Sequence, residues 1–262
     1  MTSSDPDLQS RLNIDQPHSA RIWNYLLGGK DNFAADRNAA DAVLGQLPEI
    51  REFALAGRGF LARAIGYLAG EAGIRQFLDL GTGLPTADNT HELAQRIAPE
   101  SKIVYVDNDP LVLVHARALL TSDPAGETSY IDADVRDPEK ILHAAADLLD
   151  FTKPIAVVMI GILGHIADSD NPARILRTIV DALPSGSYLA INDSITTPAN
   201  DSAVETAQQE GANYHLRTVE QITEFFAGLD LVEPGVVSTP LWRPTGETPE
   251  PIAVYCGVAR KP

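Results

Sequence analysis

Short apolar runs alternate with helix-forming segments through most of this chain, and this alternation constrains the fold more than any other feature. Three helical segments begin with Asp or Asn followed by Pro, namely "DPLVLVHARALL", "DPEKILHAAADLL" and "NPARILRTIVDAL". The acidic or amide side chain can cap the first backbone N–H groups, and proline suits the first helical position because an N–H there has no helical partner. The alternation therefore predicts an α/β protein with a parallel sheet covered by helices on both faces.

Five apolar runs are predicted to be the parallel strands, namely "QFLDL", "KIVYVD", "TSYIDADV", "PIAVVMI" and "SYLAINDS". The fourth is apolar throughout, as expected of a strand that is covered on both faces. After the fifth run, "VEQITEFFAGL" is predicted to be a helix. "LVEPGVVST" and "IAVYCGVAR" then follow with no helix between them, so we expect an antiparallel hairpin at the sheet edge and seven strands in all.

The first third of the chain is predicted to be mostly helical. Its apolar residues recur at helical spacing in the segment that contains Phe60, Leu61, Ala64, Ile65 and Leu68. We find no internal repeat and no low-complexity linker. We therefore expect a helical N-terminal extension over residues 1–73 and an α/β domain over residues 74–262.

Composition and charge narrow the function classes. Acids outnumber bases 36 to 20, which gives a formal charge of −16 and disfavours a nucleic-acid partner. No run of 18 apolar residues and no secretory signal is present, so we expect no membrane span. The single cysteine, Cys256, fits a reducing cytoplasm, and the scattered histidines give no metal-binding signature.

The ends of the first two strands carry the clearest chemistry. The first strand ends in Asp79-Leu-Gly81-Thr82-Gly83, where glycines let the backbone turn closely against a ligand. The second strand ends at Asp107, whose carboxylate can accept hydrogen bonds from a ribose diol. Because open parallel sheets bind ligands at these strand ends, the pattern indicates a nucleoside-containing cofactor, although Asp79 and Asp107 could also simply cap turns.

The residues around the first strand end distinguish between two kinds of nucleoside-containing cofactor. A dinucleotide motif would place a third glycine where Thr86 stands, and Asp79 would repel a pyrophosphate. The same carboxylate would attract the ammonium group of a methionine moiety, which favours S-adenosylmethionine. Asp134 and Val135 follow the third strand, where an acid can accept from the adenine amino group, and we group Asn108 with the cofactor-binding residues. Asp134 could instead be an ordinary loop acid.

These motifs resemble the class I S-adenosylmethionine-dependent methyltransferases. The resemblance rests on "FLDLGTG", "VYVDNDP", "DADVRDP" and "VVMIGILGHI" and covers about Ile74 to Lys261. The stretch "HSARIWNYLLGGKDNFAADR" is similar to a bacterial subfamily long catalogued as a domain of unknown function. The resemblance implies a Rossmann-like, doubly wound sheet with an antiparallel last strand, and it places Gly161 beside the transferred methyl group.

The acceptor side is less defined. His165 follows the fourth strand, Asp193 ends the fifth, and Tyr214 lies in the connection after it, so each could take a proton from the acceptor. Two of them also have a structural alternative: packing for His165 and a turn cap for Asp193. The expected function is methyl transfer by in-line displacement to an unidentified acceptor, which we expect to be a small molecule. A non-catalytic cofactor-binding protein and a nicotinamide-dependent oxidoreductase remain as alternatives.

The Gly28–Gly29 pair near the N-terminus does not form a phosphate-binding loop, because no strand precedes it and Asp31 follows Lys30. The local interpretation is a helix that begins near His18 and ends at the glycines. The resemblance implies in addition that this helix lies over the cofactor as a lid. We then expect four of its residues to reach the cofactor, with Tyr25 over the sulfonium and a basic side chain on the carboxylate: Arg21, Asn24, Tyr25 and Lys30.

Overall fold

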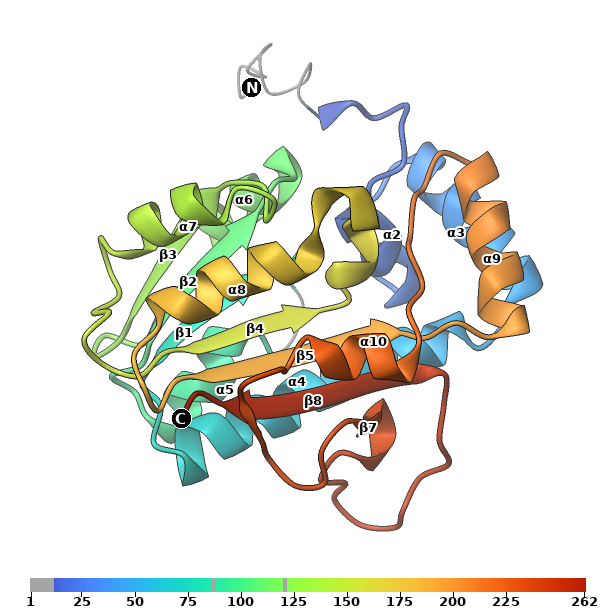
Figure 1. Ribbon diagram of the computed structural model, residues 1–262. Coiled ribbons are helices and arrows are strands. Elements are labelled where there is room, and N and C mark those ends of the chain that lie inside the picture. The colour runs from blue at the N-terminus through green and yellow to red at the C-terminus, as the bar shows by residue number, and fades with distance from the viewer. Residues whose placement is uncertain (1–11, 86–87, 120–121) are drawn as a thin grey trace, which may run out of the picture.

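The computed structural model describes residues 12–85, 88–119 and 122–262, and Figure 1 shows a central sheet with helices on both of its faces. The expected α/β architecture is confirmed. Thr86, which entered the argument against a dinucleotide, lies outside the described residues. Within those residues, no helix combines the length and apolar character that crossing a membrane requires.

The sheet has the strand order β3-β2-β1-β4-β5-β8-β6, and β7 also pairs with β8. The five strands from β3 to β5 are parallel, whereas β8 runs antiparallel to β5. The strands are β1 (Gln76–Leu80), β2 (Lys102–Asp107), β3 (Glu127–Asp132), β4 (Ala156–Ile160), β5 (Tyr188–Ser194), β6 (Asp230–Leu231), β7 (Val237–Ser238) and β8 (Val254–Arg260).

The late hairpin differs in detail from the expectation. The segment predicted as the sixth strand is divided into the two short strands β6 and β7, which gives eight strands in the sheet. Both pair with β8, so the antiparallel pairing is present. Strand β8 itself lies between β5 and β6, because its near-continuous apolar sequence is suited to a position that is covered on both faces.

Two layers of helices cover the sheet. On one face lie α4 (Ile50–Gly66) and α5 (Thr90–Ile97), and on the other lie α7 (Pro138–Ala145), α8 (Pro172–Ala182) and α10 (Val219–Glu224). Helix α6 (Pro110–Leu119) lies along β2 and β3. The predicted caps are present, since the side chains of Asp109, Asp137 and Asn171 accept hydrogen bonds from the first turns of α6, α7 and α8.

Three further helices gather beyond the carboxyl ends of the central strands. They are α2 (Ser19–Leu26), α3 (Ala34–Gln46) and α9 (Pro198–Gln209), and α3 packs along α9 (Figure 1). The sequence analysis did not identify α9, because its apolar face consists of little more than two alanines and a valine. The remaining helical turns are η1 (Tyr67–Glu71), η2 (Leu163–His165), η3 (Asp168–Asp170) and η4 (Thr239–Leu241).

Helix α4 is part of the core of the sheet, although it falls within the expected N-terminal extension. Its apolar face shares one buried cluster with residues of β1, β2, β4, β5 and β8. The ring of Phe60 lies edge-on to the fully buried Trp242, with 5.4 Å between centroids. The division at residue 73 therefore separates elements that share a hydrophobic core, and the division of the chain into an N-terminal extension and an α/β domain remains a prediction.

Replacement of Phe60 tests whether α4 and the sheet unfold together. Phe60→Ala removes a fully buried ring and should lower the free energy of unfolding by about 3–5 kcal/mol. Leu55→Ala is the control on the same helix, since Leu55 is 62% exposed and should cost less than about 0.5 kcal/mol. Urea unfolding followed by both circular dichroism and tryptophan fluorescence should give one coincident transition. Two separate transitions, with only one shifted, would contradict a shared core.

Candidate active site

A cavity of about 450 Å³ opens at the carboxyl ends of the central strands. Strand β1 lies between β2 and β4, so the strand order reverses here, and this is where open parallel sheets bind ligands. Most of the residues that were expected to bind the cofactor line this cavity: Asn24, Asp79, Gly81, Thr82, Gly83, Asp107, Asn108, Asp134, Val135 and Gly161.

The turn after β1 requires its glycines. Gly81 and Gly83 have φ angles of +69° and +68°, a region that side-chain-bearing residues rarely adopt. A Cβ at Gly81 would also collide with the side chain of Ile162, which follows β4. The N–H of Gly83 donates to the carboxylate of Asp107 over 2.8 Å. The turn is therefore bound to the end of β2 and packed against the loop after β4.

Asp79 lies on the sheet face that carries α4 and α5, because alternate residues of β1 face opposite layers. Its carboxylate accepts a hydrogen bond of 2.6 Å from the hydroxyl of Thr90, at the start of α5. Burial raises the pKa of Asp79 to about 6, so the group is mainly ionised at neutral pH. Arg58 of α4 also lines the cavity and lowers the pKa of Asp79 through its positive charge.

The second and third strand ends hold a connected set of acids. The carboxylate of Asp107 accepts from the N–H groups of Gly83 and Asp109, and burial raises its pKa. Asn108 donates to Asp134 over 3.2 Å. Asp134 also pairs with Arg136 at 2.6 Å, and the hydrogen bond from this guanidinium lowers the pKa of the Asp134 carboxyl. Arg136 lines the cavity and was not identified from the sequence.

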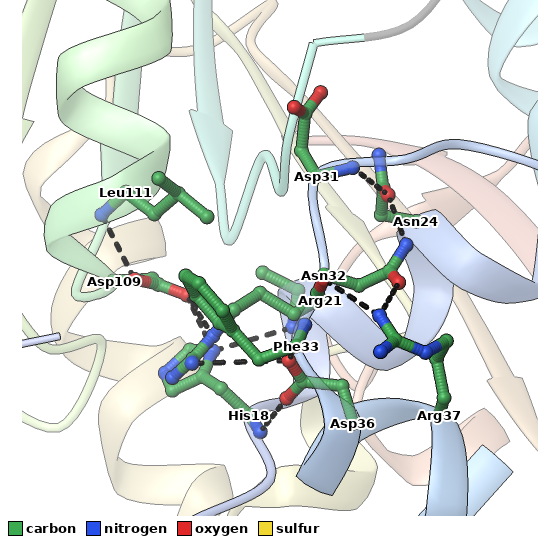
Figure 2. Close-up of polar contacts among 11 residues, drawn as sticks. His18, Arg21, Asn24, Asp31, Asn32, Phe33, Asp36, Arg37, Asp109 and Leu111 are labelled. Atoms are coloured by element: carbon green, nitrogen blue, oxygen red, sulfur yellow. Dashed lines mark hydrogen bonds and ion pairs between the residues drawn. The ribbon is translucent and has the colours of Figure 1, made fainter. Parts of the chain in front are cut away.

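The expected contacts of three residues in the N-terminal stretch are not present. Arg21, Tyr25 and Lys30 do not line the cavity. Figure 2 shows Arg21 directed toward Asp109, with 3.0 Å between Nε and the carboxylate, and its guanidinium lies over the ring of Phe33. The hydroxyl of Tyr25 donates to Asp41, and Lys30 is exposed.

Helical geometry explains this correction. Residues two positions apart on a helix differ by about 200°, so Arg21 and Tyr25 lie on the side opposite Trp23. Trp23 lines the cavity instead, and a Cβ at Gly161 would lie 3.7 Å from its indole. The aromatic residue beside Gly161 is therefore Trp23. The sequence analysis missed Trp23. A helical projection of α2 with its apolar side turned toward the cavity would have found it.

Asn24 has a structural role as well as a place in the cavity wall. Its Oδ1 accepts from the N–H of Asp31 and from Nδ2 of Asn32, which fixes the chain after the glycine pair (Figure 2). The N–H of Leu27 donates to the carbonyl of Trp23, and Gly28 has a φ of +83°. The interpretation of the glycines as a helix C-cap is confirmed.

The loop after β4 is held by two buried side chains of opposite charge. The carboxylate of Asp193 accepts from the N–H groups of Leu163 and Gly164, at 3.0 and 3.1 Å, and from the hydroxyl of Tyr214. The guanidinium of Arg217 donates to the carbonyls of Leu163 and Ile166. Donors and acceptors of the loop backbone are thus satisfied by one acid and one base.

This network changes the expectation for two of the three catalytic candidates. Asp193 lines neither the 450 Å³ cavity nor the smaller pocket beside it, so it does not face an acceptor. The proton of Tyr214 is donated to Asp193, and burial raises the pKa of Tyr214 well above 10. Both residues position the loop, and neither is suited to remove a proton from an acceptor.

His165 is placed differently. Its Nδ1 lies 3.1 Å from the carbonyl oxygen of Asn213, which can only accept, so Nδ1 carries the proton and Nε2 has the free lone pair. Within the described residues, Nε2 is buried without a hydrogen-bond partner. Burial lowers the pKa of His165 to about 4, so the imidazole is neutral at pH 7. The ring lines both the main cavity and the smaller pocket.

The sheet order, the glycine turn and the acids at the strand ends define a class I S-adenosylmethionine-dependent methyltransferase. The chain belongs to the S-adenosyl methyltransferase family, whose family model matches residues 5–262. A search of curated proteins finds no match to it. In the part of the chain that the structure describes, no group of His, Cys, Asp and Glu could hold a metal ion.

Solved structures agree with this assignment. A DUF574-family protein of Streptomyces avermitilis is 44% identical, with a TM-score of 0.92 over 96% of this chain and 100% of its own. A candidate methyltransferase from Thermobifida fusca is 40% identical, with a TM-score of 0.90 over 100% of this chain and 99% of its own. Human N-acetylserotonin methyltransferase, in complex with S-adenosylmethionine, shares the fold at 15% identity, with a TM-score of 0.52 over 97% of this chain and 65% of its own.

The cofactor is S-adenosylmethionine, and the cavity suits it chemically. A carboxylate at Asp79 matches an ammonium group, and the acid at the end of β2 matches a ribose diol. Gly83 leaves open space where a side chain would otherwise stand. The volume of about 450 Å³ is within the range of small-molecule sites.

Replacement of Asp193 tests its role in holding the loop. Asp193→Asn sets an amide against donors from two N–H groups and one hydroxyl, and should lower the free energy of unfolding by about 2–3 kcal/mol. Asp168→Asn is the control, because the side chain of Asp168 is 79% exposed where it pairs with Arg217, and such pairs contribute about 0–1 kcal/mol. Thermal and urea unfolding measure both. Equal losses of unfolding free energy in the two variants would contradict the role of Asp193 in holding the loop.

Proposed function

We propose that this S-adenosylmethionine-dependent methyltransferase acts on a small molecule whose reacting atom carries a proton, and that His165 removes this proton. The observation that carries the proposal is the free lone pair on Nε2, buried at the junction of two cavities. A neutral imidazole with its second nitrogen fixed by a carbonyl is oriented for general-base catalysis.

The main cavity orients the cofactor by charge. We assign the ammonium group to Asp79 and the α-carboxylate to Arg58, because these opposite charges line one part of the cavity. The ribose is assigned to Asp107 and the adenine amino group to Asp134, with Val135 against the base. The bound cofactor supplies an electrophilic methyl group whose carbon–sulfur electron pair stays on sulfur when an acceptor atom takes the carbon.

The chain's own residues then align the acceptor and exclude water. Trp23 lies beside Gly161, and we assign its indole to the sulfonium, which aromatic rings attract. The acceptor lies on the His165 side, where its proton can move to Nε2 as the new bond forms. Asp193, Tyr214 and Arg217 act as positioning residues, because they fix the loop that carries His165.

We propose that the acceptor is a free small molecule and that the protein acts in the cytoplasm. The formal charge of −16 would repel a phosphate backbone, and the one cysteine, Cys256, is free and buried. Titration with S-adenosylmethionine and with NAD by calorimetry tests the cofactor side. Methyl transfer from labelled cofactor to a metabolite pool tests the acceptor side, since a protein that only binds the cofactor would release no methylated product.

Cofactor affinity should depend on the charge of Asp79. Asp79→Asn removes the carboxylate and should weaken S-adenosylmethionine binding by about 10- to 100-fold. Because burial raises the pKa of Asp79 to about 6, the wild-type affinity should fall as the pH decreases below 6, when the cation must displace a proton. The variant should lack this decrease. Asp181→Asn, at an exposed position of α8, serves as the control in calorimetric titrations from pH 5 to pH 8.

Catalysis should depend on Nε2 of His165 without a matching effect on cofactor binding. His165→Asn keeps a donor for the carbonyl of Asn213 but removes Nε2, so kcat should fall by about 100-fold or more while the Kd of S-adenosylmethionine is unchanged. Because burial lowers the pKa of His165 to about 4, the wild-type rate should not change with the charge of this group between pH 6 and pH 8, and should fall toward pH 4. Unchanged turnover in the variant would refute the role of His165 as the base.

A further inference from the structure

A second, smaller pocket opens beside the main cavity. It has a volume of about 100 Å³, and its walls come from α2, α3, α4 and α9 together with the segment after α9. Trp23, Phe53 and His165 line both spaces, so the pocket continues from the cavity at the position of the proposed base. Neither α3 nor α9 contributes to the main cavity. These helices therefore shape a space distinct from the cofactor site.

The two spaces differ in charge. Aspartates 79, 107 and 134 and two arginines line the main cavity. In contrast, no Lys, Arg, Asp or Glu is among the residues that line the pocket. Most of its wall is aliphatic, with Leu26, Val43 and Leu47 as examples. Because an unpaired charge in such surroundings is strongly disfavoured, the pocket selects uncharged groups.

Two residues of the pocket wall carry a buried hydrogen-bond acceptor that has no partner among the described residues. One is Nε2 of His165, and the other is Oδ1 of Asn200, a residue that is 2% exposed. The Nδ2 group of Asn200 donates to the carbonyls of Ile195 and Ala253, which fixes the amide orientation and leaves Oδ1 as the free end. Buried polar atoms in native proteins are nearly always hydrogen-bonded, so these two point to a ligand that carries donors.

From these observations, and on the basis of the proposed function, we infer that the acceptor is an uncharged phenol whose ring occupies this pocket and whose reacting hydroxyl donates to His165. A second hydroxyl on the ring would donate to Asn200. The pocket is smaller than the apolar cavity of about 150 Å³ that admits benzene, so the ring enters it only in part and extends into the main cavity.

The acidity of a phenol matches the proposed base. A phenolic hydroxyl has a pKa near 10, as in tyrosine, and is therefore far more acidic than an aliphatic alcohol. A buried imidazole with a lowered pKa is a weak base, so it is suited to an acidic O–H bond. In the transfer, the phenol oxygen forms the bond to the methyl carbon, the carbon–sulfur electron pair stays on sulfur, and the proton moves to Nε2.

The test uses the full chain with labelled S-adenosylmethionine and a panel of defined acceptors. Phenol, catechol, resorcinol and hydroquinone are the uncharged probes, and 4-hydroxybenzoate and tyramine are their charged counterparts. We expect methylation of the uncharged probes, with kcat/KM at least about 100-fold higher than for the charged ones. At least one dihydroxybenzene should exceed phenol by about 10-fold, because it satisfies Asn200 as well. Equal use of charged acceptors would overturn the inference.

A pair of variants on α9 locates the binding site. Val204 lines the pocket, and Val204→Phe should fill it and lower kcat/KM for the phenols by 10-fold or more, with the Kd of S-adenosylmethionine unchanged. Glu205 is exposed on the same helix, so Glu205→Phe is the matched control and should change neither value. Circular dichroism confirms that both variants fold. Full phenol turnover in Val204→Phe would place the acceptor elsewhere.

Direct binding separates this inference from the proposed function. Saturation-transfer NMR measures binding of hydroquinone to the wild-type chain and to Val204→Phe, without any turnover. If S-adenosylmethionine binds and no phenol does, the inference is wrong while the cofactor site stands. If hydroquinone binds the wild type and is lost in the variant but no phenol is methylated, the pocket is supported and the catalytic role of His165 fails.

Discussion

A buried ion pair between Arg21 and Asp109 sets the geometry on which both cavities depend. It joins α2 to the start of α6, and Asp36 adds a second carboxylate 3.8 Å from the same guanidinium while accepting from the backbone of His18 and Phe33 (Figure 2). Burial of charges costs free energy that only good geometry and further hydrogen bonds offset. The cluster of Arg21, Asp36 and Asp109 therefore contributes more to the position of α2 than to the stability of the fold. Helix α2 in turn forms part of the wall of both cavities.

The site is built from two rigid parts that meet at His165. On one side, the glycine turn after β1 is bound to Asp107 at the end of β2, so the residues proposed to bind the cofactor are held in place by the sheet. On the other, Asp193 and Arg217 fix the loop after β4 through its backbone. Preorganised groups lose little entropy when an acceptor binds. Because in-line methyl transfer requires alignment of the reacting atoms, even small shifts of these groups would slow the reaction.

The sequence predicted features that depend on local interactions better than features that depend on contacts between distant segments. Asp79, Gly81 and Asp107 line the main cavity as expected, because they lie at strand ends and the carboxyl ends of parallel strands meet at one edge. Arg21 and Tyr25 were misplaced because a stretch of sequence does not indicate which side of a helix faces the sheet. Asp193 and Tyr214 were expected to face an acceptor, but they are each other's hydrogen-bond partners and hold the loop after β4, which spacing alone does not reveal.

The sequence by itself determined the class of fold, the cofactor and the edge of the sheet at which the main cavity opens. These depend on local features: apolar periodicity, proline-bearing helix starts, and glycines and acids at strand ends. Only the tertiary structure decided that Trp23 rather than Tyr25 lines the cavity beside Gly161, that Nε2 of His165 has no partner among the described residues, and that α9 completes an uncharged pocket. The physical reason is that each of these depends on the packing of segments far apart in the chain, and no local pattern records that packing.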